Sequence, residues 1–164
     1  MAGSALVTEQ AAEFREALPF GGALLGLDLG EKTVGIALCD ARWTFATAGK
    51  TLARGKFGRD KAALEAICKE RSVAGVVIGL PLNMDGSSGP RAQASRAYAR
   101  NLAQEATGLG LPVLLWDERW STASAERDMI AQDFSRAKRA QRIDSHAAAV
   151  ILQGAIDRLA GGVL

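Results

Sequence analysis

Residues 24–30 read LLGLDLG, in which one aspartate, Asp28, stands among leucines and glycines. Residues 33–40 (TVGIALCD) follow after a short turn, and the two stretches predict a pair of strands that meet at a tight connection. Side chains alternate across a strand, so Asp28 shares its face with Gly26 and Gly30, while the last three leucines occupy the other face. An ionised carboxylate inside a sheet is costly unless it is paired or bound to a metal. The glycines therefore indicate that a ligand needs access to Asp28.

A structural interpretation of Asp28 stays open. An aspartate beside a glycine commonly accepts hydrogen bonds from backbone N–H groups in a turn, and such a residue needs no ligand. The second stretch favours the ligand, because one of its faces, from Thr33 to Cys39, is also built from small residues. Glycine inside a strand weakens it, so a function would explain why the sequence tolerates this open face.

The rest of the chain predicts an α/β protein. Apolar runs bounded by turn residues predict strands, and capped or amphipathic segments predict helices. The predicted elements in chain order are a helix at 8–18 capped by Thr8, strands at 23–30, 33–40 and 43–52, a helix at 58–71, a strand at 73–79, a helix from 90 to about 107, a strand at 112–118, a helix from 121 to about 132, and a helix at 143–160. This order predicts a mixed sheet of about five strands, three antiparallel and then parallel, with helices on both faces.

Length and composition limit the organisation of the chain. Its 164 residues suit a helical extension at residues 1–22 and a single domain at residues 23–164. The two cysteines form no ligand cluster with the one histidine, so the sequence predicts neither a zinc site nor a disulfide framework and favours a reducing compartment. No apolar run is long enough to span a membrane and no secretory signal is visible, so a cytoplasmic protein without a membrane partner is expected.

The charge distribution is more informative than the total. The formal net charge of +2 is too small to predict a nucleic-acid partner by itself. Residues 50–72 and residues 133–142 are both locally basic, which suits an anionic partner, although a solvated surface explains them equally well. The second segment has no apolar periodicity, so we expect a loop that is mobile in the free protein and that substrate phosphates would order.

Two further acids stand where a ligand site is expected. Glu118 ends a predicted strand, and side chains at such carboxyl ends line the usual ligand crevice of α/β sheets. Alternation places Glu118 on the face of Trp116 and Asp117 on the other, so only one of the two acids should face the site. A rim acid paired with Arg119 is the alternative interpretation. Asp144 falls in the first turn of the last predicted helix, where the helix dipole makes a plain stabilising acid the default interpretation.

Four stretches of the chain resemble the successive motifs of one family. They are GLDLGEKTVGIAL (26–38), VVIGLPLNMDGSSGPRA (76–92), DERWST (117–122) and IDSHAAAVILQ (143–153). Together they resemble the YqgF (RuvX) family, from residue 23 to about residue 158. The resemblance implies an RNase H-like fold and a nuclease that acts on pre-16S rRNA or on Holliday junctions. The chain departs from the family pattern in its N-terminal extension and in the richness of arginine before Asp144.

The resemblance also implies which residues catalyse the reaction. The three acids of the family fall on Asp28, Glu118 and Asp144, which would be both catalytic residues and metal ligands. Carboxylates from separate segments suit hard cations, so Mg²⁺ or Mn²⁺ is expected as a pair of ions. No histidine or serine nucleophile is then required, and His146 is interpreted as a residue of the helix surface.

Nucleic acid is the expected partner, and the candidate contacts are polar or cationic side chains near the strand ends and in the second basic segment. They are Lys32, Thr33, Asn83, Ser87, Arg91, Arg119, Thr122, Arg136, Lys138, Arg139 and Arg142. Phosphate contacts of this kind position a nucleic acid rather than read its sequence.

The function expected from these residues is metal-dependent cleavage of phosphodiester bonds in the 5′-end processing of pre-16S rRNA. A Holliday junction resolvase and a non-catalytic RNA-binding factor of ribosome assembly are the alternatives. A two-lobed ATPase with a similar first hairpin is less suitable, because 164 residues build only one lobe. Ribosomal assembly intermediates are candidate partners, and either a monomer or a homodimer is compatible with the sequence.

Overall fold

The computed structural model describes residues 3–120 and 136–160, with side chains from residue 145 onward in the second range. The strands are β1 (Val7–Thr8), β2 (Ala23–Leu29), β3 (Thr33–Cys39), β4 (Ala46–Ala53), β5 (Val73–Leu80) and β6 (Val113–Asp117). The helices are α1 (Ala11–Ala17), α2 (Phe57–Arg71), α3 (Pro90–Ala103), the short 3₁₀ turn η1 (Glu118–Trp120) and α5 (Arg136–Ala160). None of these described helices is both long and apolar enough to cross a membrane.

The strands form one sheet in the order β1-β6-β5-β2-β3-β4. The β2–β3 and β3–β4 pairs are antiparallel, whereas β2–β5, β5–β6 and β1–β6 are parallel. The predicted mixed sheet is therefore confirmed, with three antiparallel strands followed by parallel ones. The sheet has six strands rather than about five.

The sixth strand comes from the N-terminal segment, which the sequence predicted to be helical. Val7 and Thr8 pair with β6, so this segment adds an edge strand before α1 begins. Two residues are too short to show a period of two, which is why the sequence pattern missed them. Thr8 does not cap the helix directly: its hydroxyl donates to Glu13 Oε1 (2.9 Å) and accepts from the backbone N–H of Gln10 (3.0 Å).

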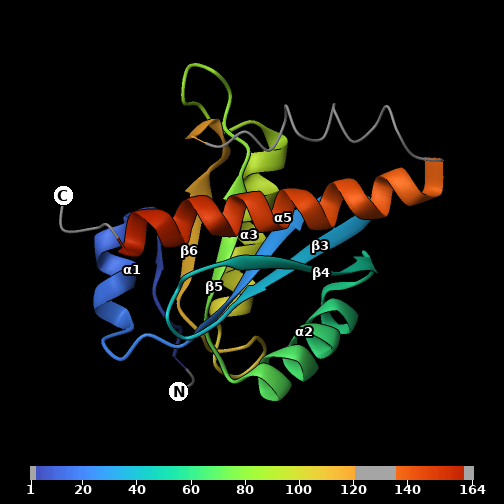
Figure 1. The fold of residues 1–164 in the computed structure, drawn as a ribbon. Helices are drawn as coiled ribbons and strands as arrows, with labels where there is room; N and C mark the ends of the chain where they lie inside the picture. Colours follow the sequence, from blue (N-terminus) through green and yellow to red (C-terminus); the bar gives the residue numbers. More distant parts are fainter. Residues whose placement is uncertain (1–2, 121–135, 161–164) are drawn as a thin grey trace.

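Helices cover both faces of the sheet, as predicted. Figure 1 shows α5 crossing one face with α1 beside it, while α3 lies behind the strands and α2 lies at their lower right. The core beneath α2 and α3 contains large aliphatic residues such as Leu25, Leu27 and Ile78. The core beneath α5 includes Ala37 of β3, and α5 itself contributes small residues such as Ala148.

The glycine-rich face of β2 is filled by α5 and is not open. A Cβ atom at Gly26 would lie 2.8 Å from Leu152 Cβ and 3.2 Å from the carbonyl oxygen of Ala148. The expectation that Gly26 clears a path for a ligand is therefore wrong. Gly26 instead permits the backbone of α5 to approach the strand closely, which is the usual reason for glycine at a helix–sheet contact.

The basic segment was predicted to be a loop, but α5 begins at Arg136 and includes residues 136–142. The sequence RAKRAQR contains only alanine and long unbranched side chains, which are strong helix formers, so the helix continues without an apolar face to bury. Asp144 consequently lies well inside α5 and not in its first turn. The helix dipole acts on the first turn only, so it no longer explains this acid. The helix predicted from 121 to about 132 lies outside the described residues.

Candidate functional site

The carboxyl ends of β2, β5 and β6 meet at one edge of the sheet, because these three strands are mutually parallel. They point to the upper edge in Figure 1, where the loop after β5 projects. Asp28 is the second-to-last residue of β2, and Glu118 directly follows β6. This edge is the place where α/β sheets usually bind ligands.

Asp28 stands between two strands that present no side chain beside it. It pairs with Gly35 on β3. On the other side, the last β2–β5 pair is Leu27 with Ile78, so Gly79 is the residue of β5 next to Asp28. Asp28 is only 4% exposed. A buried carboxylate therefore lies at the end of β2, and the residue beside it on each neighbouring strand is a glycine.

Glu118 reaches the same face from the other side of Gly79. A Cβ atom at Gly79 would lie 3.1 Å from Glu118 Cδ and 2.6 Å from Ile151 Cδ1 of α5. Glu118 thus lies on the α5 face of the sheet, as strand alternation predicted. Gly79 lets Ile151 and Glu118 lie directly against β5, and any side chain at position 79 would displace them.

The position of Asp144 relative to the sheet is known from the backbone of α5. The next residue, Ser145, is buried and shares a hydrogen bond with the Thr51 hydroxyl on β4. Position 144 also lies one helical turn before Ala148, whose carbonyl oxygen approaches Gly26. The side chain of Asp144 lies outside the described atoms. Among the side chains that are described, no three acidic, histidine or cysteine residues form a group able to hold a metal ion.

The donor chemistry of the two described acids fits a hard divalent cation. Both supply carboxylate oxygens, which Mg²⁺ and Mn²⁺ prefer to nitrogen or sulfur ligands. Gly79 allows the carboxyl group of Glu118 to lie against the strand next to Asp28, since a Cβ atom at position 79 would lie 3.1 Å from Glu118 Cδ.

The neighbouring acid Asp117 has a different role. Its side chain lies on the other face, because Asp117 pairs with Leu80 of the α2–α3 core. Arg119 Nε lies 3.1 Å from both carboxylate oxygens and Arg119 Nη2 lies 2.7 Å from Oδ2. Burial raises the pKa of Asp117, but the hydrogen bonds and charge of Arg119 outweigh this effect and leave the pKa below its ordinary value. The rim acid paired with Arg119 is therefore Asp117.

Arg119 also ties the end of β6 to the loop that follows β5. Its Nη1 donates to the carbonyl oxygen of Met84 at 3.3 Å. Within the loop, Asn83 Nδ2 donates to the Ser87 hydroxyl (2.9 Å), which donates to Asp85 Oδ1 (2.6 Å). These hydrogen bonds hold the pKa of Asp85 below its ordinary value. Asn83, Ser87 and Arg119 thus shape an exposed loop above the acids, and their contact with nucleic acid stays a prediction.

The remaining predicted contacts divide into two groups. Lys32 and Arg91 are exposed and Thr33 is half-buried, and all three lie around the β2–β3 turn and the start of α3. Thr122 lies outside the described residues. The four basic residues from Arg136 to Arg142 lie in the first turns of α5, and their side chains are outside the described atoms.

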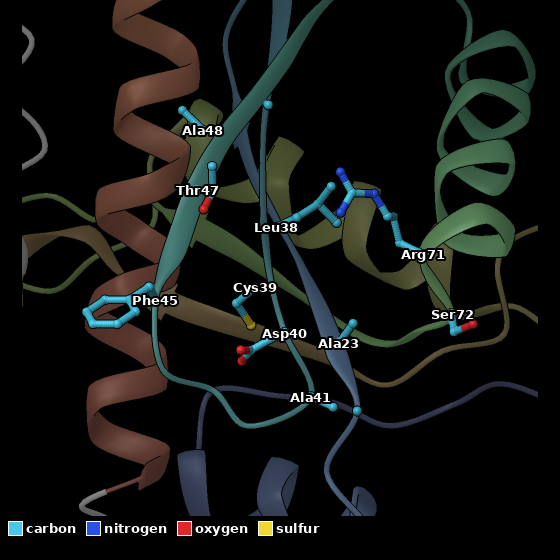
Figure 2. Close-up of a pocket in the computed structure, with 12 residues that line it drawn as sticks. Ala23, Leu38, Cys39, Asp40, Ala41, Phe45, Thr47, Ala48, Arg71 and Ser72 are labelled. Carbon is cyan, nitrogen blue, oxygen red and sulfur yellow. The ribbon is translucent and has the colours of Figure 1, made fainter.

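A large cavity lies at the other end of the sheet. It has a volume of about 760 Å³ and is bounded by Ala23 at the start of β2, Cys39 at the end of β3 and Arg71 at the end of α2. Figure 2 shows Arg71 and Asp40 on its walls. Asp40 is the only acid among the described residues that line it, so this cavity has no group of carboxylates comparable with the opposite edge.

A family model described as "RuvX: Holliday junction resolvase" matches residues 22–158. The chain belongs to the RuvX family. The family prediction made from the four motifs is therefore confirmed, and the match covers all five strands from β2 to β6. In this family context the acids at the carboxyl edge become the candidate active site.

Curated relatives of this RuvX chain are similar over nearly their whole length. A protein from Novosphingobium aromaticivorans is 66% identical over 156 residues, which cover 95% of this chain and 98% of the relative. A protein from Sphingopyxis alaskensis is 62% identical over 154 residues, covering 94% and 99% respectively. Both carry the name "Putative pre-16S rRNA nuclease".

A solved structure supports the fold of this RuvX chain. It is titled "T. thermophilus RuvC in complex with Holliday junction substrate", and it matches with a TM-score of 0.50 and 14% sequence identity. The match covers 85% of this chain and 96% of the RuvC chain. At this identity the likeness concerns the fold alone, and the expected RNase H-like sheet is confirmed.

Sequence reasoning missed the two glycines that flank Asp28 from neighbouring strands. Gly35 was noticed only as a small residue of β3, and Gly79 only as the end of a buried strand. The available signal was a glycine at the carboxyl end of a central strand, directly before the LPLNMDG loop. The register that places Gly79 beside Asp28 is visible only in the folded sheet.

Proposed function

We propose that this chain is a nuclease that hydrolyses phosphodiester bonds with the help of divalent metal ions. The observation that carries the proposal is the pair of acids, Asp28 and Glu118, placed on one sheet face with Gly79 between them. Asp144 on α5 is the third member. Membership of the RuvX family supports the same reaction class.

Asp28, Glu118 and Asp144 would hold Mg²⁺ or Mn²⁺, in the arrangement of two ions expected from the sequence. Such ions activate a water molecule for attack and stabilise the leaving oxygen of a phosphodiester. Asp28 is the central ligand of this proposal, since glycines flank it on both sides. The close packing of α5 against Gly26 excludes solvent from the base of the site and fixes the helix that carries position 144.

The proposed substrate is the 5′ region of pre-16S rRNA. The names of the two relatives above 60% identity support this choice. The description of the family model supports a second candidate, the four-way DNA junction. The chain would act in the cytoplasm, where pre-rRNA and ribosomal assembly intermediates occur, and its two free cysteines suit that reducing compartment.

A cleavage assay tests both the reaction and the substrate. Purified protein is incubated with a labelled pre-16S 5′ fragment and with a labelled four-way DNA junction, each in Mg²⁺, Mn²⁺ or EDTA. We expect cleavage of the RNA with either ion and none in EDTA, and loss of cleavage in Glu118→Gln. Asp117→Asn serves as the neighbouring control for charge: it should weaken the loop contact but retain cleavage.

The other outcomes separate the alternatives. Cleavage of the junction alone would identify a resolvase. Tight RNA binding without cleavage under any metal condition would contradict the nuclease and leave an RNA-binding assembly factor. Equal activity in EDTA would contradict the role of metal ions.

A further inference from the structure

A second polar region lies at the same edge of the sheet, on the face opposite α5. A cavity of about 180 Å³ is bounded by the β2–β3 turn, the end of β4 and the start of α3. Two arginines line it: half-buried Arg54, directly after β4, and exposed Arg91, in the first turn of α3. In the sequence, Arg54 is recognisable only as part of the basic segment 50–72.

Arg54 is held in one orientation by its surroundings. Its Nη1 donates to the carbonyl oxygen of Gly30 at 2.6 Å. Its guanidinium carbon lies 5.4 Å from the centre of the Tyr98 ring, within the range of a cation–π contact. Phe57 packs edge-on against the same ring, with 5.3 Å between centroids. The guanidinium is therefore fixed between a backbone carbonyl and an aromatic face.

A buried acid supports the aromatic ring in turn. Asp60 is 3% exposed, and its oxygens accept from the Tyr98 hydroxyl (3.3 Å) and from the Gly55 N–H (3.0 Å). Burial, followed by the charge of Asp60, raises the pKa of Tyr98, so the hydroxyl stays protonated and continues to donate. Gly55 directly follows Arg54, so this contact also fixes the backbone next to the arginine.

The two arginines retain unused hydrogen-bonding capacity. A guanidinium carries five N–H donors, and Arg54 uses one of them on Gly30. Arg91 makes a single long contact of 3.5 Å to the carbonyl oxygen of Leu29. Within the described part of the chain, neither arginine forms an ion pair with an aspartate or glutamate. Two neighbouring cations without a carboxylate partner, one of them fixed, favour an anion that binds through several oxygens.

The position of the cavity indicates which anion is expected. Gly30 lies two residues beyond Asp28, a distance of roughly 7 Å along an extended chain. A nucleic-acid strand whose scissile phosphate lies at Asp28 therefore carries neighbouring phosphates past the β2–β3 turn. Glu31 also lines the cavity and opposes an anion, but it is exposed and can turn toward solvent.

We infer that Arg54 and Arg91 form a subsite for a backbone phosphate of the substrate strand, next to the scissile one. This inference rests on the proposed nuclease function. Arg54 and Arg91 bind the phosphate, whereas Tyr98 and Asp60 are positioning residues that keep Arg54 aimed at the cavity. The subsite would hold the strand in register over Asp28 without reading its bases.

Salt-dependent binding of a labelled single-stranded oligonucleotide, made as RNA and as DNA, tests the subsite. Binding is measured in EDTA so that no strand is cut. Arg54→Gln should lower the affinity about tenfold at low salt, since a charge-assisted hydrogen bond is lost. It should also reduce the slope of log K against log salt by about 0.7, and Arg54→Gln with Arg91→Gln should reduce it by about twice that amount.

Matched variants separate phosphate binding from a structural role. Arg54→Lys keeps the charge but loses the planar fork, so it should restore most of the salt slope even if its melting temperature falls. Arg71→Gln removes the same charge beside the distant cavity of Figure 2 and should leave the slope unchanged. Glu31→Gln removes the opposing charge and should raise the affinity.

Two results would overturn the subsite. An Arg54→Gln variant with the same salt slope as Arg71→Gln would leave Arg54 with a structural role only. Displacement of the oligonucleotide by an equal concentration of inorganic phosphate would indicate a site for free phosphate instead of a strand. Failure of the proposed function is distinguishable, because the wild-type protein would then not cut the strands in Mg²⁺ or Mn²⁺, whatever the salt slope of the Arg54 variants.

Discussion

The two faces of the sheet differ in the size of the side chains they present. Beneath α2 and α3 the strands contribute leucine, isoleucine and valine, and α2 adds fully buried Leu64. Beneath α5 the strands contribute Gly26, Gly79 and Ala37, and Leu152 and Ile151 of α5 pack directly over the two glycines. Large side chains separate a helix from a sheet, whereas small ones let the two backbones approach.

This difference in side-chain size suggests that the α2–α3 face mainly stabilises the fold, whereas the α5 face mainly positions the acids. The α2–α3 face buries large apolar groups of the strands, and burial of such groups stabilises the fold. On the α5 face, glycines let the helix that carries Asp144 approach the sheet closely. This helix lies against β2, which carries Asp28, and on the same face as Glu118, which directly follows β6. If this comparison is right, substitutions on the two faces should have different consequences for folding and for catalysis.

Asp28→Asn should have the largest effect on catalysis. The change removes one carboxylate from the α5 face, and metal ions contribute several kcal/mol to such a transition state, so cleavage should fall about 10³-fold or more. The melting temperature without metal should hold or rise, since one like charge leaves an acidic region. The measurements are single-turnover cleavage and thermal unfolding in EDTA.

Asp40→Asn is the control for Asp28→Asn, because Asp40 is exposed and lies beside the distant cavity of Figure 2. It should leave both cleavage and melting temperature unchanged. Retained cleavage in Asp28→Asn, together with a clear fall in its melting temperature, would show that Asp28 is a structural residue.

Leu64→Ala should have the largest effect on stability. Leu64 is a fully buried residue of α2, and removing a leucine side chain from such a site costs about 2–5 kcal/mol of the free energy of unfolding. Cleavage per folded molecule should stay within about twofold, because the α2 face does not carry the acids. Urea unfolding monitored by circular dichroism, with cleavage measured far below the transition, checks both statements. A parallel loss of cleavage would show that the faces are not independent.

Gly26→Ala adds a single methyl group and should lower both the stability of the protein and its cleavage activity. The added Cβ would lie 2.8 Å from Leu152 Cβ, so α5 must shift, and overpacking of this kind costs about 1–3 kcal/mol. The shift should also lower cleavage, because α5 carries position 144.

Gly58→Ala is the matched control for Gly26→Ala. A Cβ atom at Gly58 in α2 meets nothing within 4 Å, so the same chemical change should be neutral or stabilise the helix by up to about 1 kcal/mol. Equal stabilities of the two variants would contradict the close approach of α5. The bulkier Gly26→Val should destabilise the protein further.

The smallest expected effect is the slow reaction of the two cysteine thiols, one of which lies on each face of the sheet. Burial raises the pKa of both Cys39, in the core beneath α5, and Cys68, beside the core beneath α2, from 9.0 to about 11. At pH 8 the thiolate fraction is then about 100-fold below that of a thiol with the ordinary value, so both should react slowly with a thiol reagent. Denaturant should restore fast reaction of both.

The same shifts predict a loss of stability at alkaline pH. The unfolded chain binds fewer protons than the folded one between about pH 9 and 11, so the free energy of unfolding falls across that window and is unaffected below it. A thiol that reacts rapidly at pH 8 in the folded protein would show that its face opens locally.

The sequence was sufficient for the features that depend on local periodicity. Alternation along β2 and β6 placed Asp28 and Glu118 at the carboxyl edge and separated Glu118 from Asp117. The α5 face of the sheet was recognised as a face of small residues. These predictions succeeded because a strand period of two decides the direction of each side chain.

Features that depend on contacts between distant segments were not predictable. Small residues on β2 fit both an open site and a closely packed helix, and only the position of α5 distinguishes them. The pairing of Val7 with Val113 and the support of Arg54 by Tyr98 each join residues far apart in the chain. The helical residues 136–142 were missed for another reason: the prediction required an apolar face, whereas intrinsic propensity is enough to extend a helix that packing has already anchored.

The order of the elements also has a consequence for how the protein is made. Helix α5 contacts β2, β3, β4 and β5, yet all six strands leave the ribosome before it. Until α5 has been synthesised, the face with Leu24, Val77 and Leu114 is covered only in part, by Phe14 and Leu18 of the N-terminal segment. At about 5–20 residues per second the nascent chain presents this apolar surface for seconds, a period in which chaperones or other chains can bind it. Synthesis of α5, the helix that carries Asp144, therefore also covers the apolar surface that could otherwise aggregate.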